Sequence, residues 1–205
     1  HKDIKILQII KEDNQKAYII LDLYARSKKR GGAWMHDMTS RLKRISDSNS
    51  NSNKYIAPIA TVTCNFQPAL PGSINNQALL NHDDVVTLFH EMGHALQHVL
   101  TKIDYLAISG ISHVPWDAVE VCSQFLENFC WDKNILKSLS SHIKTQKPLS
   151  DELLNKILEA RKFQGALGIL RQVQFGIFDM CLHANNKNFA KTKFGISNIY
   201  EILNN

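Results

Sequence analysis

The sequence lacks any hydrophobic run approaching the roughly 20 residues that a membrane-spanning helix needs. The first residues also lack the basic flank, the apolar core and the small-residue cleavage site of a signal peptide. These absences predict a protein with no membrane partner. The chain opens on His1 and not on an initiator Met, so we expect it to be a piece of a longer protein.

Paired cysteines and a strong charge excess are absent as well. No two of the four cysteines have the C-x-x-C spacing of a zinc or redox motif, and dispersed thiols are typical of a reducing compartment. The formal net charge of +5 is small for 205 residues, and no aromatic residues interleave with the densest basic run, Arg26 to Arg30. We therefore expect no nucleic-acid partner and interpret that run as a solvated turn.

The composition is that of a globular protein, and the first 70 residues favour β structure. Residues 4–10 and 17–26 are β-rich runs around a polar turn, which predicts a hairpin. Residues 26–38 are expected to be irregular and residues 46–54 to form a flexible surface loop. Residues 55–66 predict a strand with Val62, Cys64 and Phe66 on one face.

From Asn81 onward the pattern becomes helical. Asn81 and Asp84 predict a capping box at the start of the first helix. Further helices are expected over residues 116–131, over residues 148–182 and after Ser197. The predicted fold class is therefore mainly α with a small β portion. We expect a single partial domain, 1–205, made of a β-rich part, 1–70, and a helical part, 81–205.

The first helix contains the pattern H-E-x-x-H, His90-Glu91-Met92-Gly93-His94. Residues four apart lie on one helix face, about 6 Å apart along the axis, so two imidazoles can reach one zinc ion. The glutamate between them can deprotonate a water held by the metal. Five residues also match by chance in unrelated helices, but their place in an amphipathic helix favours a metal site.

Three further residues near the motif are informative. His98 lies about 12 Å along the helix from His90, so a packing or hydrogen-bonding role is expected for it. Gly93 costs about 1 kcal/mol inside a helix relative to alanine, which predicts a close neighbour. A catalytic zinc needs a third protein ligand, and Glu120 is surrounded by apolar residues in the next predicted helix. Asp117 and Glu127 are the other candidates there.

Several longer runs of this sequence resemble one family in order along most of the chain. The chain resembles the thimet oligopeptidase and oligopeptidase A family of zinc metallopeptidases, and the bacterial oligopeptidase A branch most of all. The matching runs are LDLYARSKKRGGAW, ATVTCNF, TLFHEMGHALQHVLT, GISHVPWDAVEVCSQFLENFCW and ILRQVQFGIFDMCLH.

The resemblance implies a zincin-like catalytic core with one Zn²⁺ per chain. It implies that His90, His94 and Glu120 bind zinc and that Glu91 is the general base. It also implies a cytoplasmic endopeptidase that hydrolyses short peptide substrates. Gly110 and His113 lie in a loop that resembles the family's glycine-containing loop near bound peptide, so they are candidate substrate contacts. A flexible connection is the competing interpretation of both.

The chain departs from the family pattern in three ways. Met92 replaces the usual Phe, and Cys122 stands where a Pro is usual. Family members also have a helical region before this segment and a later Tyr- and His-bearing segment that stabilises the reaction intermediate. Because both regions of the parent are missing here, the isolated chain is expected to be weak or inactive. The alternatives are a non-catalytic zinc or peptide-binding fragment, an inert structural fragment, and a dipeptidyl carboxypeptidase of the same superfamily.

Overall fold

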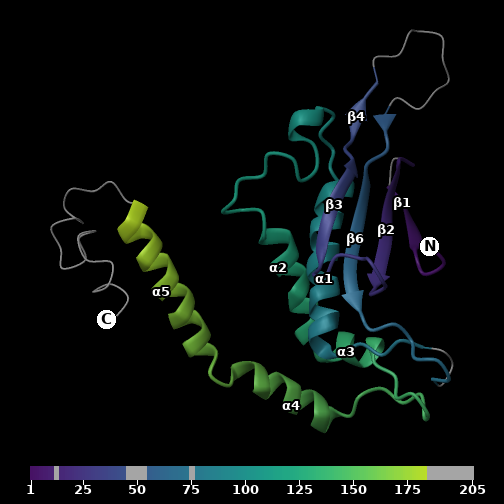
Figure 1. Ribbon diagram of the computed structural model, residues 1–205, viewed down its shortest axis with the longest axis vertical. Helices are drawn as coiled ribbons and strands as arrows, with labels where there is room; N and C mark the ends of the chain where they lie inside the picture. Colours follow the sequence, from purple (N-terminus) through teal and green to yellow (C-terminus); the bar gives the residue numbers. More distant parts are fainter. Residues whose placement is uncertain (12–13, 45–54, 74–76, 184–205) are drawn as a thin grey trace. The chain divides into compact units, whose positions relative to one another are not determined.

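The computed structural model describes residues 1–11, 14–44, 55–73 and 77–183 (Figure 1). It divides into two compact units, His1–Leu149 and Ser150–Asn205. No described helix combines the length and the apolar character that a membrane crossing requires. The predicted surface loop at 46–54 and the predicted helix after Ser197 lie outside the described residues.

The first unit is built on a four-stranded mixed sheet in the order β1-β2-β6-β3. The strands are β1(Lys5–Ile10), β2(Lys16–Tyr24), β3(Trp34–Thr39) and β6(Ile59–Phe66). β1 and β2 are antiparallel neighbours, which confirms the predicted hairpin. β6 lies parallel to β2 and antiparallel to β3, so β3 is an edge strand. The short strands β4(Leu42–Lys43) and β5(Tyr55–Ile56) form a separate two-stranded sheet.

The prediction that residues 26–38 are irregular is wrong from Trp34 onward, where the chain forms the edge strand β3. Trp34 pairs with Thr63 and Met35 pairs with Val62 in the antiparallel ladder with β6. From Met35 to Thr39 the strand alternates between partly buried and exposed positions, but Asp37 is on the partly buried side and Met38 is exposed. The residue types therefore carry little period-2 signal. Pairing with a distant central strand determines its conformation instead.

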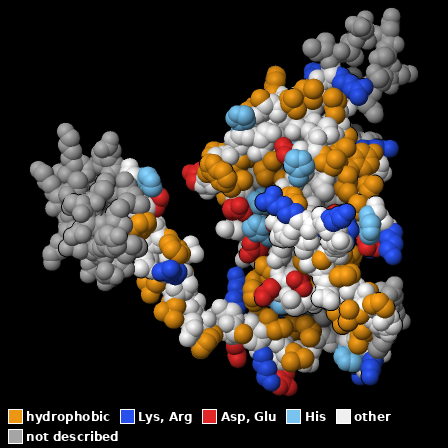
Figure 2. Space-filling model, viewed as in Figure 1, with side chains coloured by type: hydrophobic (Ala, Val, Ile, Leu, Met, Phe, Trp, Pro, Cys, Tyr) orange, Lys and Arg blue, Asp and Glu red, His pale blue; other side chains and the backbone are white. Residues whose placement is uncertain are grey.

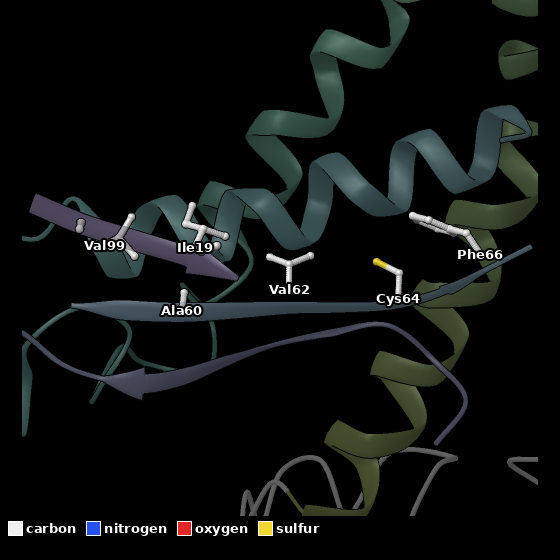
Figure 3. Packing of buried hydrophobic residues seen from close by; sticks show 8 residues of the cluster. Ile19, Ala60, Val62, Cys64, Phe66 and Val99 are labelled. Carbon is white, nitrogen blue, oxygen red and sulfur yellow. The ribbon is translucent and has the colours of Figure 1, made fainter. Parts of the chain in front are cut away.

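The long helix α1(His82–Val99) covers one face of the sheet and forms the core with it (Figure 3). β6 contributes the buried side chains of Val62, Cys64 and Phe66, which confirms the predicted strand face. Fully burying one such large apolar side chain stabilises a fold by about 1.5–3 kcal/mol. The core therefore fixes α1 firmly against the centre of the sheet.

The predicted cap of α1 is confirmed. The Asn81 side chain accepts a hydrogen bond from the Asp84 backbone N–H at 2.8 Å, and the Asp84 carboxylate accepts from the Asn81 N–H at 3.1 Å. This reciprocal pair satisfies two backbone donors that would otherwise lack partners. It fixes where α1 starts, and so fixes the turn on which the H-E-x-x-H residues lie.

The second predicted helix is shorter than the sequence indicated. The segment after α1 contains the 3-10 helix η2(Leu106–Ile108), then α2(Val121–Glu127), the 3-10 helix η3(Asn128–Trp131) and α3(Lys133–Leu139). Residues 116–120 form turns with i to i+3 hydrogen bonds, such as the one from Ala118 N–H to Pro115 O. Glu120 consequently occupies the N-cap of α2 and not its interior.

The second unit contains α4(Asp151–Lys162) and α5(Gly165–His183). Ser150 caps α4 by accepting a hydrogen bond from the Leu153 N–H. The helical region predicted over residues 148–182 is confirmed, but it consists of two helices, because the chain breaks at Phe163 and Gln164. Gln164 has φ of 54°, a left-handed conformation that cannot continue an α-helix.

Candidate metal centre

The first two candidate ligands come from adjacent turns of α1. His90 and His94 are four residues apart, and their ring centroids are separated by 5.0 Å. The core holds the turn between them, because the side chains of Glu91 and Ala95 are buried against the sheet side of the helix. The two imidazoles therefore project from a rigid element and not from a loop.

Glu120 is the third candidate ligand, and its carboxylate lies beside both histidines. Its Oε2 lies 3.2 Å from His90 Nε2 and 3.1 Å from His94 Nε2. Two ligands bound to tetrahedral zinc at 2.0–2.1 Å are about 3.3 Å apart, so these separations fit one shared ion. All three ligand atoms lie within 4.8 Å of one another. Two imidazoles and a carboxylate also match the chemistry of a catalytic zinc site.

A close contact between helices explains how Glu120 reaches α1. A Cβ added to Gly93 would lie 2.5 Å from Ser123 Cα and 2.6 Å from Cys122 O. Real side chains do not approach so closely, so only glycine lets α2 pack directly on this turn of α1. The predicted close neighbour of Gly93 is thereby confirmed as the backbone of the ligand-bearing segment.

Ser123 holds the carboxylate of Glu120 in position. Its buried hydroxyl donates to Glu120 Oε2 at 2.7 Å. That hydrogen bond is the main cause that lowers the pKa of Glu120 below its usual value, and the neighbouring His94 and His90 act in the same direction. Glu120 therefore stays ionised, as a metal ligand must. No sequence pattern assigned a role to Ser123, although its position three residues after Glu120 was the available signal.

Glu91 occupies a different environment from Glu120. Its side chain is buried, and this burial raises the pKa of its carboxyl group above the usual value. The backbone of Met35, on the edge strand β3, has a smaller and opposite effect and lowers that pKa. A buried carboxylate with a raised pKa suits a general base working near neutral pH. The two glutamates are thus poised for different chemistry.

Burial also prepares His94 for metal binding. It lowers the pKa of the imidazole below its usual value, so the ring stays neutral at pH 7 and keeps a lone pair for a metal. Its Nδ1 is buried without a hydrogen-bond partner among the described residues. Nε2, the nitrogen that faces Glu120, is therefore the nitrogen available for coordination.

The other two acidic candidates from the sequence do not belong to the cluster of ligand atoms. Glu127 Oε1 contacts His90 Nδ1 at 2.6 Å, on the side of the ring away from Glu120. Asp117 belongs to the turns before α2 and is not a member of the described ligand cluster. Figure 2 shows acidic and histidine side chains adjoining each other at the surface over α2.

His98 has the hydrogen-bonding role that its spacing predicted. Its buried ring lies outside the ligand cluster, with Nε2 donating to Thr39 O at 3.0 Å and Nδ1 accepting from the Ile111 N–H at 3.4 Å. His98 therefore joins α1 to the end of β3 and to the loop after η2.

The two candidate substrate contacts lie in that same loop. A Cβ on Gly110 would lie 2.3 Å from His98 Nδ1, and Gly110 has φ of +68°, so packing alone requires glycine there. His113 is exposed with φ of 60°. Neither belongs to the ligand cluster. Their contact with a peptide stays a prediction.

Comparisons with known proteins show the family of the chain. The model of peptidase family M3 matches residues 1–205. The chain belongs to peptidase family M3. Oligopeptidase A of Escherichia coli (strain K12) is 47% identical over 185 residues, which are 90% of this chain and 26% of that protein. Saccharolysin of Saccharomyces cerevisiae is 34% identical over 188 residues, which are 89% of this chain and 25% of that protein.

A plant member shows the same partial coverage. The chloroplastic/mitochondrial organellar oligopeptidase A of Arabidopsis thaliana is 40% identical over 171 residues, 83% of this chain and 21% of its own length. The M3 chain described here therefore spans about a quarter of the length of the relatives that it matches. Family membership agrees with the resemblance carried by the sequence runs.

Proposed function

We propose that this chain carries the metal-binding and general-base residues of a zinc-dependent endopeptidase that hydrolyses short oligopeptides. The observation that supports it most directly is the convergence of three ligand atoms, from His90, His94 and Glu120, within 4.8 Å beside the buried Glu91. The name oligopeptidase, printed for several relatives, supports the substrate class. A zincin-like core and a cytoplasmic location are parts of the same proposal.

Three residues of the chain would bind the metal, and a fourth would transfer the proton. His90 Nε2, His94 Nε2 and Glu120 Oε2 would hold one zinc ion, which lowers the pKa of a bound water toward about 7 and acts as a Lewis acid. Glu91 accepts a proton from the water that attacks the carbonyl carbon of the scissile peptide bond. As the C–N bond breaks, Glu91 delivers that proton to the leaving amine.

The chain alone is expected to cleave peptides weakly or not at all. The Escherichia coli relative is about three and a half times as long, and the ligands and base supply only part of the residues needed for cleavage. Losing one donor to a developing oxyanion typically lowers the rate by about 10²–10³. Cleavage is therefore best measured in the full-length parent, whereas metal binding is measured in the 205-residue chain.

The first experiment is metal content per chain by elemental mass spectrometry after zinc loading and dialysis. We expect about one zinc per chain, and its absence would refute the proposed ligand set. The second is Glu91→Gln in the full-length parent, with the exposed Glu159→Gln on α4 as the matched control. The Glu91 variant should keep its zinc and lose cleavage, whereas the control should keep both.

The outcomes separate the competing functions. Zinc retained with no Glu91-dependent cleavage would indicate a non-catalytic zinc or peptide-binding protein. Digestion of one octapeptide by the parent distinguishes the two enzyme classes. Internal cleavage supports the endopeptidase, and stepwise release of C-terminal dipeptides identifies a dipeptidyl carboxypeptidase.

A further inference from the structure

Helix α2 carries a second carboxylate on the face that contacts His90. Glu127 is seven residues after Glu120, about two helical turns, so both side chains point toward the same side of α2. Glu120 Oε2 lies 3.2 Å from His90 Nε2, and Glu127 Oε1 lies 2.6 Å from His90 Nδ1. The His90 ring is therefore held between two carboxylates at opposite edges.

The contact with Glu127 determines which nitrogen of His90 carries the proton. An ionised carboxylate only accepts hydrogen bonds, so Nδ1 must be the donor in the 2.6 Å contact. With the proton on Nδ1, the lone pair that can bind a metal lies on Nε2, the nitrogen that faces Glu120. A hydrogen bond to a charged group is also stronger and more directional than a neutral one.

His94 shows that this arrangement is not a general consequence of the helix. Its Nδ1 is buried without a hydrogen-bond partner among the described residues, so packing orients that ring. The His90 side chain is 27% exposed, compared with 10% for His94. A partly exposed ring needs another constraint to keep one orientation, and Glu127 is its hydrogen-bond partner on the Nδ1 side.

Glu127 is badly placed to be a ligand itself. Its contacting oxygen lies at the Nδ1 edge of the ring, whereas the three candidate ligand atoms gather at the Nε2 edge. Within the described part of the chain its ion-pair partner is His90, and its side chain is 31% exposed. Replacing it should therefore disturb packing little.

We propose that Glu127 is a positioning residue of the metal site: it fixes the tautomer and the orientation of His90 so that Nε2 faces the metal. This inference rests on the proposed function, because it assumes that His90 is a ligand. Carboxylates that orient metal-binding histidines typically contribute about 10- to 100-fold in metal affinity.

The test compares zinc affinity in four variants of the 205-residue chain by competition with a chromophoric chelator. Glu127→Gln keeps an oxygen acceptor without the charge, so its affinity should fall about tenfold. Glu127→Ala removes the acceptor as well, and its affinity should fall about 100-fold. Glu159→Gln is the matched control, and Glu120→Ala gives the loss expected for a true ligand. Melting temperatures of the metal-free variants verify that each one is folded.

A second readout reports the tautomer directly. Nitrogen-15 correlation spectra of the zinc-loaded chain should show His90 with its proton on Nδ1 and its Nε2 bound to zinc, and should show a mixture of both ring orientations in Glu127→Ala. Zinc affinities within twofold of the wild type in both Glu127 variants would overturn the inference. A loss in Glu127→Ala equal to that in Glu120→Ala would assign Glu127 as a ligand and would also overturn it.

The same experiment separates this inference from the proposed function. If the wild-type chain binds no zinc, the ligand set itself fails, and the role of Glu127 fails with it. If the wild type binds zinc and the Glu127 variants bind it equally well, only the positioning role is lost.

Discussion

Gly93 lies directly against the backbone of Ser123, with only 2.5 Å between Ser123 Cα and the place where a Cβ of Gly93 would be. This single approach joins the two histidines on α1 to the carboxylate of Glu120, because Ser123 also donates to that carboxylate at 2.7 Å. A glycine in the middle of the metal motif is thus part of how the third ligand is placed.

Gly93→Ala is expected to separate α2 from α1 and weaken zinc binding. Alanine gains about 1 kcal/mol in helix propensity, but overpacking a tight contact typically costs about 1–3 kcal/mol, so the net effect should be destabilising. Thermal unfolding and zinc competition would measure it. The matched control is Gly168→Ala on α5, where an added Cβ meets nothing within 4 Å and stability should rise. A fully zinc-competent Gly93→Ala chain would contradict the packing argument.

Ser123→Ala is expected to weaken zinc binding while leaving the chain folded. It removes the hydroxyl that donates to Glu120 Oε2, and a hydrogen bond to a charged group contributes about 1.5–3 kcal/mol. Zinc affinity should fall about 10- to 100-fold if the hydrogen bond mainly holds the ligand in place. Chelator competition provides the measurement, and Ser138→Ala on α3 is a control whose exposed hydroxyl donates to the Ile135 carbonyl of its own helix. Equal zinc affinities in both variants would show that Ser123 does not contribute to the metal site.

Gly110→Ala is expected to destabilise the chain more than Gly72→Ala does. Both glycines have positive φ, +68° and +79°, so both substitutions carry the cost of a left-handed alanine, about 1–2 kcal/mol. Only at Gly110 would the added Cβ also collide with a neighbour, because it would lie 2.3 Å from His98 Nδ1. The difference between the two melting temperatures therefore isolates the contact with His98. Equal destabilisation would show that the loop accommodates the extra methyl group.

The thiols should differ sharply in reactivity. Burial raises the pKa of Cys64 to about 12 and that of Cys130 to about 11, so both remain unreactive thiols at pH 8. Cys122 is only partly buried. Alkylation of the folded chain followed by peptide mapping should label Cys122 well before Cys64 and Cys130, and unfolding in urea should remove the difference. Early labelling of Cys64 would contradict the packing of β6 against α1.

The raised pKa of Cys64 also predicts a dependence of stability on pH. An unfolded thiol loses its proton near pH 9, whereas the folded one keeps it to about 12. Between these values the folded state binds more protons than the unfolded state, so the free energy of unfolding falls as pH rises from about 9 to about 12. Urea unfolding across this range should show a shallower decline in Cys64→Ala. An identical decline in both chains would refute the assignment.

Local sequence patterns predicted the parts of the fold that local interactions determine. The capping box of α1, the H-E-x-x-H face, the hairpin and the buried face of β6 depend on residues only a few positions apart. The start of α2 and the break at Gln164 were not predicted, because turns with i to i+3 hydrogen bonds and a left-handed residue leave little trace in hydrophobic periodicity. The edge strand β3 was missed because its ladder partner lies about 25 residues away, outside any local window.

The sequence by itself determined that two histidines and a glutamate occupy one turn of an amphipathic helix, since a spacing of four fixes their face. It left three acidic residues after that helix as candidates for the third ligand, and only the resemblance to a family singled out Glu120. Only the tertiary structure placed these residues relative to one another. The absence of a side chain at Gly93 lets α2 pack on α1, and Ser123 holds the carboxylate of Glu120 beside the Nε2 atoms of both histidines. Glu127 contacts Nδ1, at the opposite edge of the His90 ring. Those distances depend on how two helices pack, and helix packing is set by contacts between residues far apart in the chain.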